Sequence, residues 1–133
     1  MPYLATSIND SAVIVGTLAE DFADLRGRAL AFNDDGLVTT AKSDTDMVIG
    51  VALMNNDKDA LNAGNDVNIQ IKDIGHVIIG AAVKKGQALS VDASGRFVPA
   101  TAGQGVFAIA LDAAENPDDY ISAMVGHFGT AKA

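Results

Sequence analysis

The sequence of 133 residues contains no cysteine and no tryptophan, and it has only three prolines and two tyrosines. The absence of cysteine excludes disulfide bonds, thiolate metal sites and cysteine nucleophiles. The scarcity of aromatic residues removes the stacking platforms on which binders of single strands and many carbohydrate binders depend. The apolar residues are instead mostly Ala, Val, Ile and Leu, which suit a small and tightly packed β interior.

Basic residues are also scarce, because nine Lys and Arg stand against seventeen Asp and Glu and give a net charge of -8. Such a surface repels phosphate backbones, so we expect no nucleic-acid partner. The longest uncharged apolar run, VIIGAAV at residues 77–83, is far shorter than the roughly 20 residues of a membrane helix. The first residues, MPYLATSIND, lack the basic start of a signal peptide. We therefore expect no membrane partner, and synthesis without export in the cytoplasm.

From residue 28 onward, short runs of Val, Ile and Leu alternate with clusters of Gly, Asn and Asp. This pattern is typical of short strands joined by tight turns, and the length fits one domain, so we expect an all-β fold. The expected strands are residues 29–32, 37–40, 48–53, 67–73, 77–79, 88–91, 97–99, 106–111 and 120–127.

The two halves of this region resemble each other. Three segments of the first half match three of the second in the same order: 27–36 with 86–95, 48–53 with 106–111, and 67–75 with 121–129. Each half is then a β unit that cannot bury both of its faces alone, and two packed units would form one sandwich or barrel. We predict a single β domain at residues 26–133, duplicated at about 27–75 and 86–129. A chance similarity between two segments rich in Gly and Ala is the alternative.

The first 25 residues lie outside this duplication. Residues 11–16 (SAVIVG) are a possible strand, and Thr17 with Glu20 has the spacing of a capping box, which predicts a short helix or turn over residues 18–25. We predict that residues 1–25 form an extended N-terminal arm that contacts another protein, for example by strand addition. An arm packed on its own domain is the alternative. The candidate contact residues are Tyr3, Leu4, Ile8, Val13, Ile14 and Val15.

Residues for catalysis or metal binding form no recognisable pattern. His76 and His127 are the only histidines, and they occupy different positions of the duplication. Residues 57–64 (DKDALNAG) are similar to a calcium loop but lack the glycine at the sixth position and the distal glutamate. No nucleophile elbow, phosphate-binding loop or dinucleotide fingerprint is present. We therefore expect a protein that is not an enzyme, with no catalytic residues, no metal and no cofactor.

Residues 83–98 (VKKGQALSVDASGRFV) resemble the strand that precedes the modified lysine in lipoyl and biotinyl carrier domains. Such a carrier needs its lysine at the tip of the following hairpin. Here the tip is Asp92-Ala93-Ser94-Gly95, and no lysine occurs between Lys85 and Lys132. The tip has a structural explanation, because an Asx side chain opens a turn and glycine ends it.

The repeated pattern of a G-x-A-L strand, a turn ending in Gly and a V-x-x-x-A-L strand resembles small decoration (cement, head-stabilising) proteins of tailed bacteriophages. The resemblance covers roughly residues 27–129 and is clearest in GHVIIGAAVKKGQALSVDASGRFVPATAGQGVFAIALDAA at residues 75–114. The sequence departs from the family at Gln87, where an acidic residue is usual after the glycine, and in a longer loop at residues 54–66.

The resemblance implies a small β-barrel or β-tulip-like domain that binds the outer surface of a phage capsid and stabilises it, with an N-terminal segment that clamps neighbouring subunits. It implies the phage major capsid protein as partner, a homotrimer, and a place on the capsid exterior of the virion. The alternative is a non-catalytic binding module, such as a carrier-like accessory domain or a tail or fibre domain.

Overall fold

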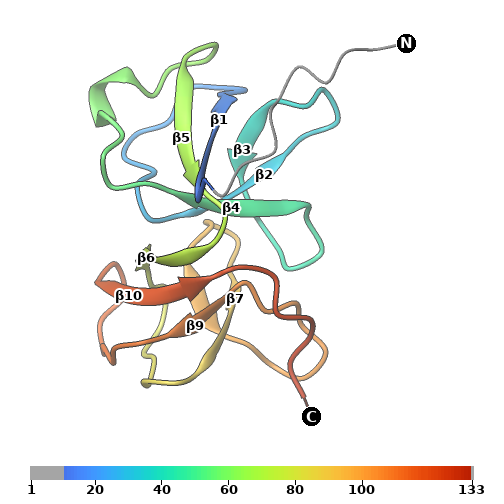
Figure 1. Cartoon of the computed structure of the whole chain (residues 1–133), viewed down its shortest axis with the longest axis vertical. Coiled ribbons are helices and arrows are strands. Elements are labelled where there is room, and N and C mark those ends of the chain that lie inside the picture. Colours follow the sequence, from blue (N-terminus) through green and yellow to red (C-terminus); the bar gives the residue numbers. More distant parts are fainter. Residues whose placement is uncertain (1–10, 133) are drawn as a thin grey trace.

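The computed structural model describes residues 11–132, and this range contains ten strands and one short 3₁₀ helix, η1 (Lys58–Ala60) (Figure 1). Within it, no helix has the length and apolar character needed to cross a membrane. The first five strands form sheet A, which we call unit 1: β1 (Val13–Thr17), β2 (Ala29–Phe32), β3 (Val38–Thr40), β4 (Val48–Ala52) and β5 (Asp66–Gln70). The other five form sheet B, or unit 2: β6 (Asp73–Ile78), β7 (Ala88–Val91), β8 (Phe97–Pro99), β9 (Ala108–Ala110) and β10 (Tyr120–Val125).

The two sheets have the same topology. Their strand orders are β1-β5-β4-β2-β3 and β6-β10-β9-β7-β8, and all neighbours are antiparallel. The register agrees as well, since Ala29 pairs with Val51 in sheet A and Ala88 pairs with Ile109 in sheet B. The prediction of an all-β fold from two similar units is confirmed. The duplication also begins earlier than the sequence indicated, because β1 and β6 are its equivalent first strands.

Each sheet curls until its two outermost strands approach each other. Leu18, just after β1, makes a single parallel bridge to Val38 of β3, and Ile79 makes the equivalent bridge to Phe97 of β8. One bridge does not amount to a hydrogen-bonded strand pair, so the described strands form two curled sheets rather than the closed barrel that we expected. The physical reason is length, because β3 and β8 have three residues each and offer too few groups to pair along a full seam.

The β2–β3 and β7–β8 hairpins close through the same turn. In unit 1 the Asn33 side chain accepts hydrogen bonds from the backbone N–H groups of Asp35 and Leu37, at 2.9 and 3.0 Å. In unit 2 Asp92 accepts from Ser94 and Arg96 at 2.8 and 2.9 Å. The glycines that end these turns, Gly36 and Gly95, have φ of 75° and 77°, a conformation that only glycine adopts without strain.

Two local predictions were wrong. The strand expected at residues 67–73 ends at Gln70, and β6 begins at Asp73. The chain turns between them because the Gln70 side-chain amide donates to the carbonyls of Lys72 and Ile74, both at 2.9 Å, and Asp73 takes a positive φ of 71°. Residues 18–25 form no helix and contain only bends after Leu18, and the turn that was the alternative follows them at residues 26–27.

The apolar interior consists of two clusters. The first lies wholly in unit 1, and its members are Leu18, Leu25, Leu30, Val38, Ala52, Leu61, Val67 and Ile69. The second, which we call the joint cluster, combines the inner side chains of sheet B with Ala29, Ala31, Ala41, Val48 and Val51 of unit 1. Because strand residues alternate between faces, Ala29 and Ala31 lie on the face of β2 opposite to Leu30. Sheet A is therefore buried on both faces, and the second face unites the two units, which lie above and below each other in Figure 1.

Candidate functional site

The N-terminal contact residues predicted from the sequence fall into two groups. Tyr3, Leu4 and Ile8 lie outside the described residues. Val13, Ile14 and Val15 are in β1, which pairs with β5 at the edge of sheet A, and the exposed fraction of Val15 is 61%. Leu18 and Leu25 are buried in the unit 1 cluster. Residues 13–25, which we had assigned to the arm, thus pack on their own domain, while β1 still presents three consecutive apolar side chains to solvent.

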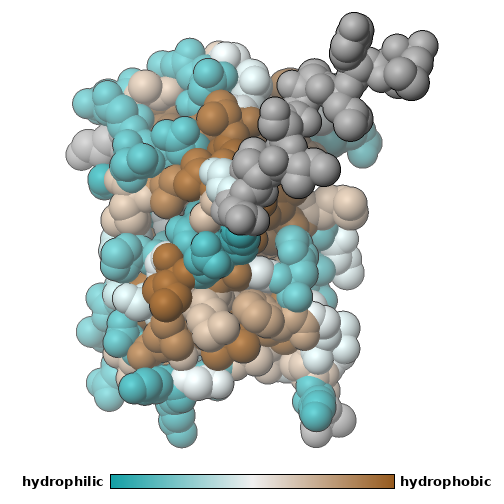
Figure 2. Space-filling model, viewed as in Figure 1, coloured by the Kyte–Doolittle hydropathy of each residue, from teal (hydrophilic) through white to brown (hydrophobic). Residues whose placement is uncertain are grey.

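The other exposed large apolar side chains were missed by the sequence analysis, and they are Phe32, Met47, Ile74, Tyr120, Met124 and Phe128. Figure 2 shows apolar surface over both halves of one face of the molecule. A signal for Met124 was present, because Ile121, Ala123 and Val125 are buried and alternation along β10 points Met124 outward. The apolar runs that predict the strands do not by themselves distinguish inward from outward positions.

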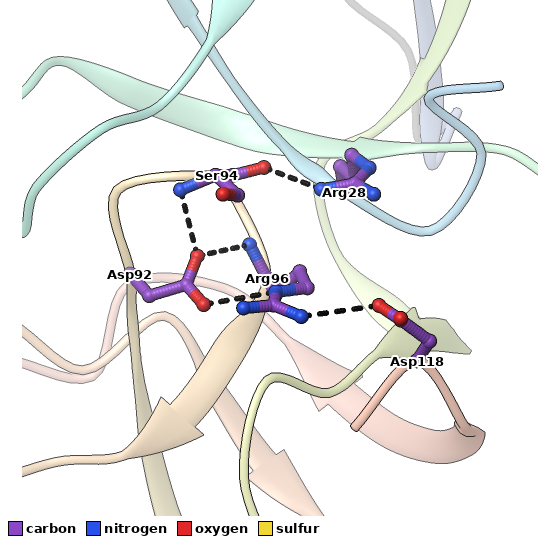
Figure 3. A network of polar contacts seen from close by, with 5 residues as sticks. All are labelled: Arg28, Asp92, Ser94, Arg96 and Asp118. Atoms are coloured by element: carbon purple, nitrogen blue, oxygen red, sulfur yellow. Dashed lines mark hydrogen bonds and ion pairs between the residues drawn. The ribbon is translucent and has the colours of Figure 1, made fainter. Parts of the chain in front are cut away.

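A network of polar contacts surrounds the turn that we had compared with a carrier hairpin (Figure 3). The Arg96 guanidinium donates from Nε to Asp92 at 3.0 Å and from Nη1 to Asp118 at 3.1 Å. Arg28 of unit 1 donates to the Ser94 carbonyl at 2.7 Å, and the backbone N–H of Ala29 donates to the Gly95 carbonyl at 2.8 Å. The tip of this hairpin therefore packs against unit 1, whereas a carrier has to present its tip to other proteins.

Arg96 forms ion pairs with two carboxylates of this network, those of Asp92 and Asp118. The hydrogen bond to Asp118, followed by the negative charge of Asp92, raises the pKa of Arg96 above its ordinary value. The guanidinium stays ionised in any case, so its role is to hold the β7–β8 turn near Asp118. The side chains of Arg96 and Asp118 are 27% and 65% exposed, and ion pairs of this kind contribute about 0–1 kcal/mol. The network fixes local geometry more than it adds stability.

The histidines and acidic residues are engaged separately. Nε2 of His127 lies 2.7 Å from the Val48 carbonyl, and the His127 ring meets Phe107 edge-on at 5.7 Å between centroids. His76 is exposed on β6. Asp57, the first residue of the calcium-like segment, caps η1 by accepting from the backbone N–H of Asp59. Among residues 11–132, no group of three or more histidines or acidic residues has an arrangement that could hold a metal ion.

Comparison with known proteins shows similarity to a solved structure. No protein-family model matches the chain, and no curated protein does. A solved structure that is similar, with a TM-score of 0.64, is described as the crystal structure of head fiber gp8.5 N base in bacteriophage phi29. The similarity covers 91% of this chain and 98% of that chain at 21% sequence identity. The chain thus has the fold of that head fibre base over nearly its whole length.

Proposed function

We propose that this chain is a structural protein of a phage head, which binds the outer surface of the capsid and stabilises it without catalysing a reaction. The observation that carries the proposal is the similarity over 91% of the chain to the base of a phage head fibre. The sequence pattern of residues 27–129, which resembles phage decoration proteins, supports it independently. Fold alone does not determine function, so the agreement between these two observations is what gives the proposal weight.

The surface of the described residues suits this role. The net charge of -8 disfavours binding to nucleic acid. This suits the surface of a virus particle, which is released into a medium that contains nucleic acids and must not bind them. The exposed apolar side chains of β1 offer a protein partner an edge strand, and an edge strand can accept another strand through its free backbone groups. We propose that β1 and residues 1–10 together contact the major capsid protein, and that the protein acts as a homotrimer on the virion.

Capsid stabilisation follows from mass action. A protein that binds the intact shell and not its dissociated subunits stabilises the shell by about 2.7 kcal/mol per site at a hundredfold excess over the Kd. Several weak contacts made by one oligomer also add up, because each contact raises the effective concentration for the next.

The test uses purified heads of the phage that encodes this chain, prepared without the protein. We expect the protein to co-sediment with these heads and to raise the temperature at which they release DNA or dissociate. Deleting residues 1–10 should leave the circular dichroism spectrum unchanged and weaken binding, and unchanged binding would remove these residues from the contact. Absence of binding by the intact chain would refute the proposed function.

A charge substitution localises the contact further. Val15→Asp places a carboxylate on β1, and we expect at least a tenfold loss of affinity for the heads. The matched control is His76→Asp, because Val15 pairs with Asn68 and His76 pairs with Ser122 at the equivalent place in unit 2. Equal losses for the two variants would show that β1 has no special role.

A second candidate function is the base of a longer fibre, which the description of the similar structure as a head fibre base favours. Electron microscopy of heads decorated with the natural protein separates the two candidates. A decoration protein gives compact knobs, whereas a fibre base gives projections that extend beyond the volume of this domain.

A further inference from the structure

The outward face of sheet A, which is the face opposite to the unit 1 cluster, is covered within the chain. Ala29, Val48 and Val51 line this face, and all three are buried in the joint cluster. Unit 2 reaches them through Gly95, whose carbonyl accepts from Ala29, and through His127, whose ring lies 2.7 Å from the Val48 carbonyl. A unit of this fold therefore accepts another such unit on its outward face.

Among residues 11–132, the equivalent face of sheet B has only partial cover, because Ser90 of β7 lies on it and is fully buried, whereas Ile74 and Met124 lie exposed on β6 and β10. Its strands are in register so that four apolar residues lie side by side across β6, β10, β9 and β7, and we call them the sheet-B row: Ile74, Met124, Ile109 and Ala88. Ile74 is 66% exposed, Met124 is exposed, and Ile109 and Ala88 are half-buried. The corresponding row of sheet A is Val13, Gln70, Val51 and Ala29, which are 38%, 6%, 2% and 0% exposed, so that it is open only at the edge strand β1.

The sheet-B row borders a hollow on the surface. Ile74 and Met124 line it together with Asp73, Val125 and Phe128, and it is open to solvent, with a volume of about 670 Å³. A shallow apolar hollow of this kind fits protruding side chains of a protein better than a small molecule, which needs an enclosing site.

The complementary part of the contact is also left free, in unit 1. In unit 2, Val91 is 4% exposed and lies with Phe97 in the joint cluster, against which Phe107 packs. The register equates Phe32 of unit 1 with Val91, since Phe32 pairs with Val38 and Val91 pairs with Phe97. Phe32 is 40% exposed.

The glycines of the two hairpin turns also differ in how closely other residues approach them. A Cβ on Gly95 would lie 3.1 Å from the Ala29 carbonyl oxygen, whereas a Cβ on Gly36 would have no neighbour within 4 Å. Phe32, Met47 and Ile49 line a second hollow of about 230 Å³, together with Asp46 and Val48 and with Phe107 and His127 of unit 2. We call Phe32, Met47 and Ile49 the unit 1 patch. Met47 is the most exposed large apolar residue of those that the structure describes, at 77%.

We propose that a second copy of this chain occupies the sheet-B row, with the unit 1 patch of that copy seated on it, in a repeat of the contact that joins the two units inside one chain. The contact uses different surfaces on the two partners, so it is heterologous, and each added copy leaves one row and one patch open. Copies joined in this way form a closed ring or an open filament. The inference concerns self-association alone and is tested without capsids.

The first experiment measures molar mass by analytical ultracentrifugation over a range of protein concentrations. We expect the natural chain to show at least twice the chain mass of 13.6 kDa and Met124→Asp to show the mass of one chain, because a carboxylate buried without a partner is costly. The matched control is Val13→Asp, since Val13 is exposed to a similar extent on the edge of sheet A and should leave the mass unchanged. Circular dichroism confirms that each variant is folded.

The second experiment tests for two different surfaces. Met47→Asp blocks the patch and leaves the row intact, so each variant alone should sediment as one chain. An equimolar mixture of Met47→Asp and Met124→Asp should form a one-to-one pair, because one intact row can still meet one intact patch. A contact between two rows would give no pair in the mixture.

Three results would overturn the proposal: a natural chain that sediments as one chain at every concentration, a Met124→Asp variant that keeps the natural mass, or a mixture that does not associate. If the natural chain is monomeric and Met124→Asp loses only its binding to heads, the row binds the capsid and not a second copy. Failure of the natural chain to bind heads would refute the proposed function and leave the self-association result standing.

Discussion

Unit 1 and unit 2 share a strand order, a register and a turn, yet they bury different parts of themselves. Sheet A is covered on both faces, since one face encloses the unit 1 cluster and the other enters the joint cluster. Sheet B is covered on its inner face, and its outward face carries the exposed Ile74 and Met124. The position of a residue within the repeat therefore does not determine its burial. The neighbour on the outward face does.

The two hairpin turns show the same difference locally. Asn33 and Asp92 make equivalent hydrogen bonds, and Gly36 and Gly95 have nearly equal φ angles. Gly95 is buried against unit 1, while Gly36 is exposed. Equivalent substitutions in the two units thus separate what the local fold requires from what the packing between units requires.

The largest effect is expected from truncating the core at the joint. Phe97 is fully buried in the joint cluster, and Phe97→Ala should lower the free energy of unfolding by about 3–5 kcal/mol. Val38 holds the equivalent position in the unit 1 cluster, and Val38→Ala removes less and should cost about 2 kcal/mol. Urea denaturation followed by circular dichroism measures both values.

The shape of the transition sharpens the comparison. Because the joint cluster contains residues of both units, we expect both the natural chain and Phe97→Ala to unfold in one transition. Two separate transitions, with unit 1 surviving the first, would show that the units are not coupled through this cluster.

The next effect is expected at the turn glycines. Gly36→Ala meets no neighbour and should cost about 1–2 kcal/mol, the penalty of a left-handed conformation for a side chain. Gly95→Ala has that penalty too, and its Cβ would also press on the carbonyl oxygens of Ala29 and Ala41, at 3.1 and 3.3 Å. A total of about 2–5 kcal/mol is expected, because crowding adds about 1–3 kcal/mol. Equal losses in thermal or urea unfolding would mean that the two turns have equivalent surroundings.

Much of the fold was predictable from the sequence because its signals are local. The Asx side chain and the glycine of each hairpin turn determine where β2–β3 and β7–β8 reverse, and the apolar runs mark the strands between them. The equivalence of β1 and β6 was not predictable in this way. Gly16 and Val77 hold matching positions in the two strands, since Gly16 pairs with Val67 and Val77 pairs with Ile121. Glycine has no side chain and valine has a branched apolar one, so the sequences of the two strands show no similarity at this position.

The candidate surface was less predictable, because the exposure of its residues depends on which sheet is covered by the other unit. Ala29 and Ala88 are identical residues in matching strands, and only the packing of unit 2 on sheet A makes one buried and the other half-buried. The bend after β5 was not predictable either, because residues 67–73 alternate as a strand would, whereas the Gln70 side chain ends the strand through hydrogen bonds to the carbonyls of Lys72 and Ile74. Apolar side chains on outward strand positions were the signal that we could have used and did not.

The smallest effect is expected from exchanging one hydroxyl between the units. Ser90 is fully buried, and its Oγ has no hydrogen-bond partner among the described residues, while the equivalent residue in β2 is Ala31. A buried polar group without a partner costs about 1–3 kcal/mol, so Ser90→Ala should raise the free energy of unfolding by about 1 kcal/mol and Ala31→Ser should lower it by about 1–3 kcal/mol. Both substitutions keep the side chain small, and therefore a difference in urea midpoint at constant m-value reports the hydroxyl and not a repacked core. If Ser90→Ala instead destabilises the chain, the Ser90 hydroxyl has a partner such as an internal water, and the outward face of sheet B is more polar at this point than the comparison with sheet A indicates.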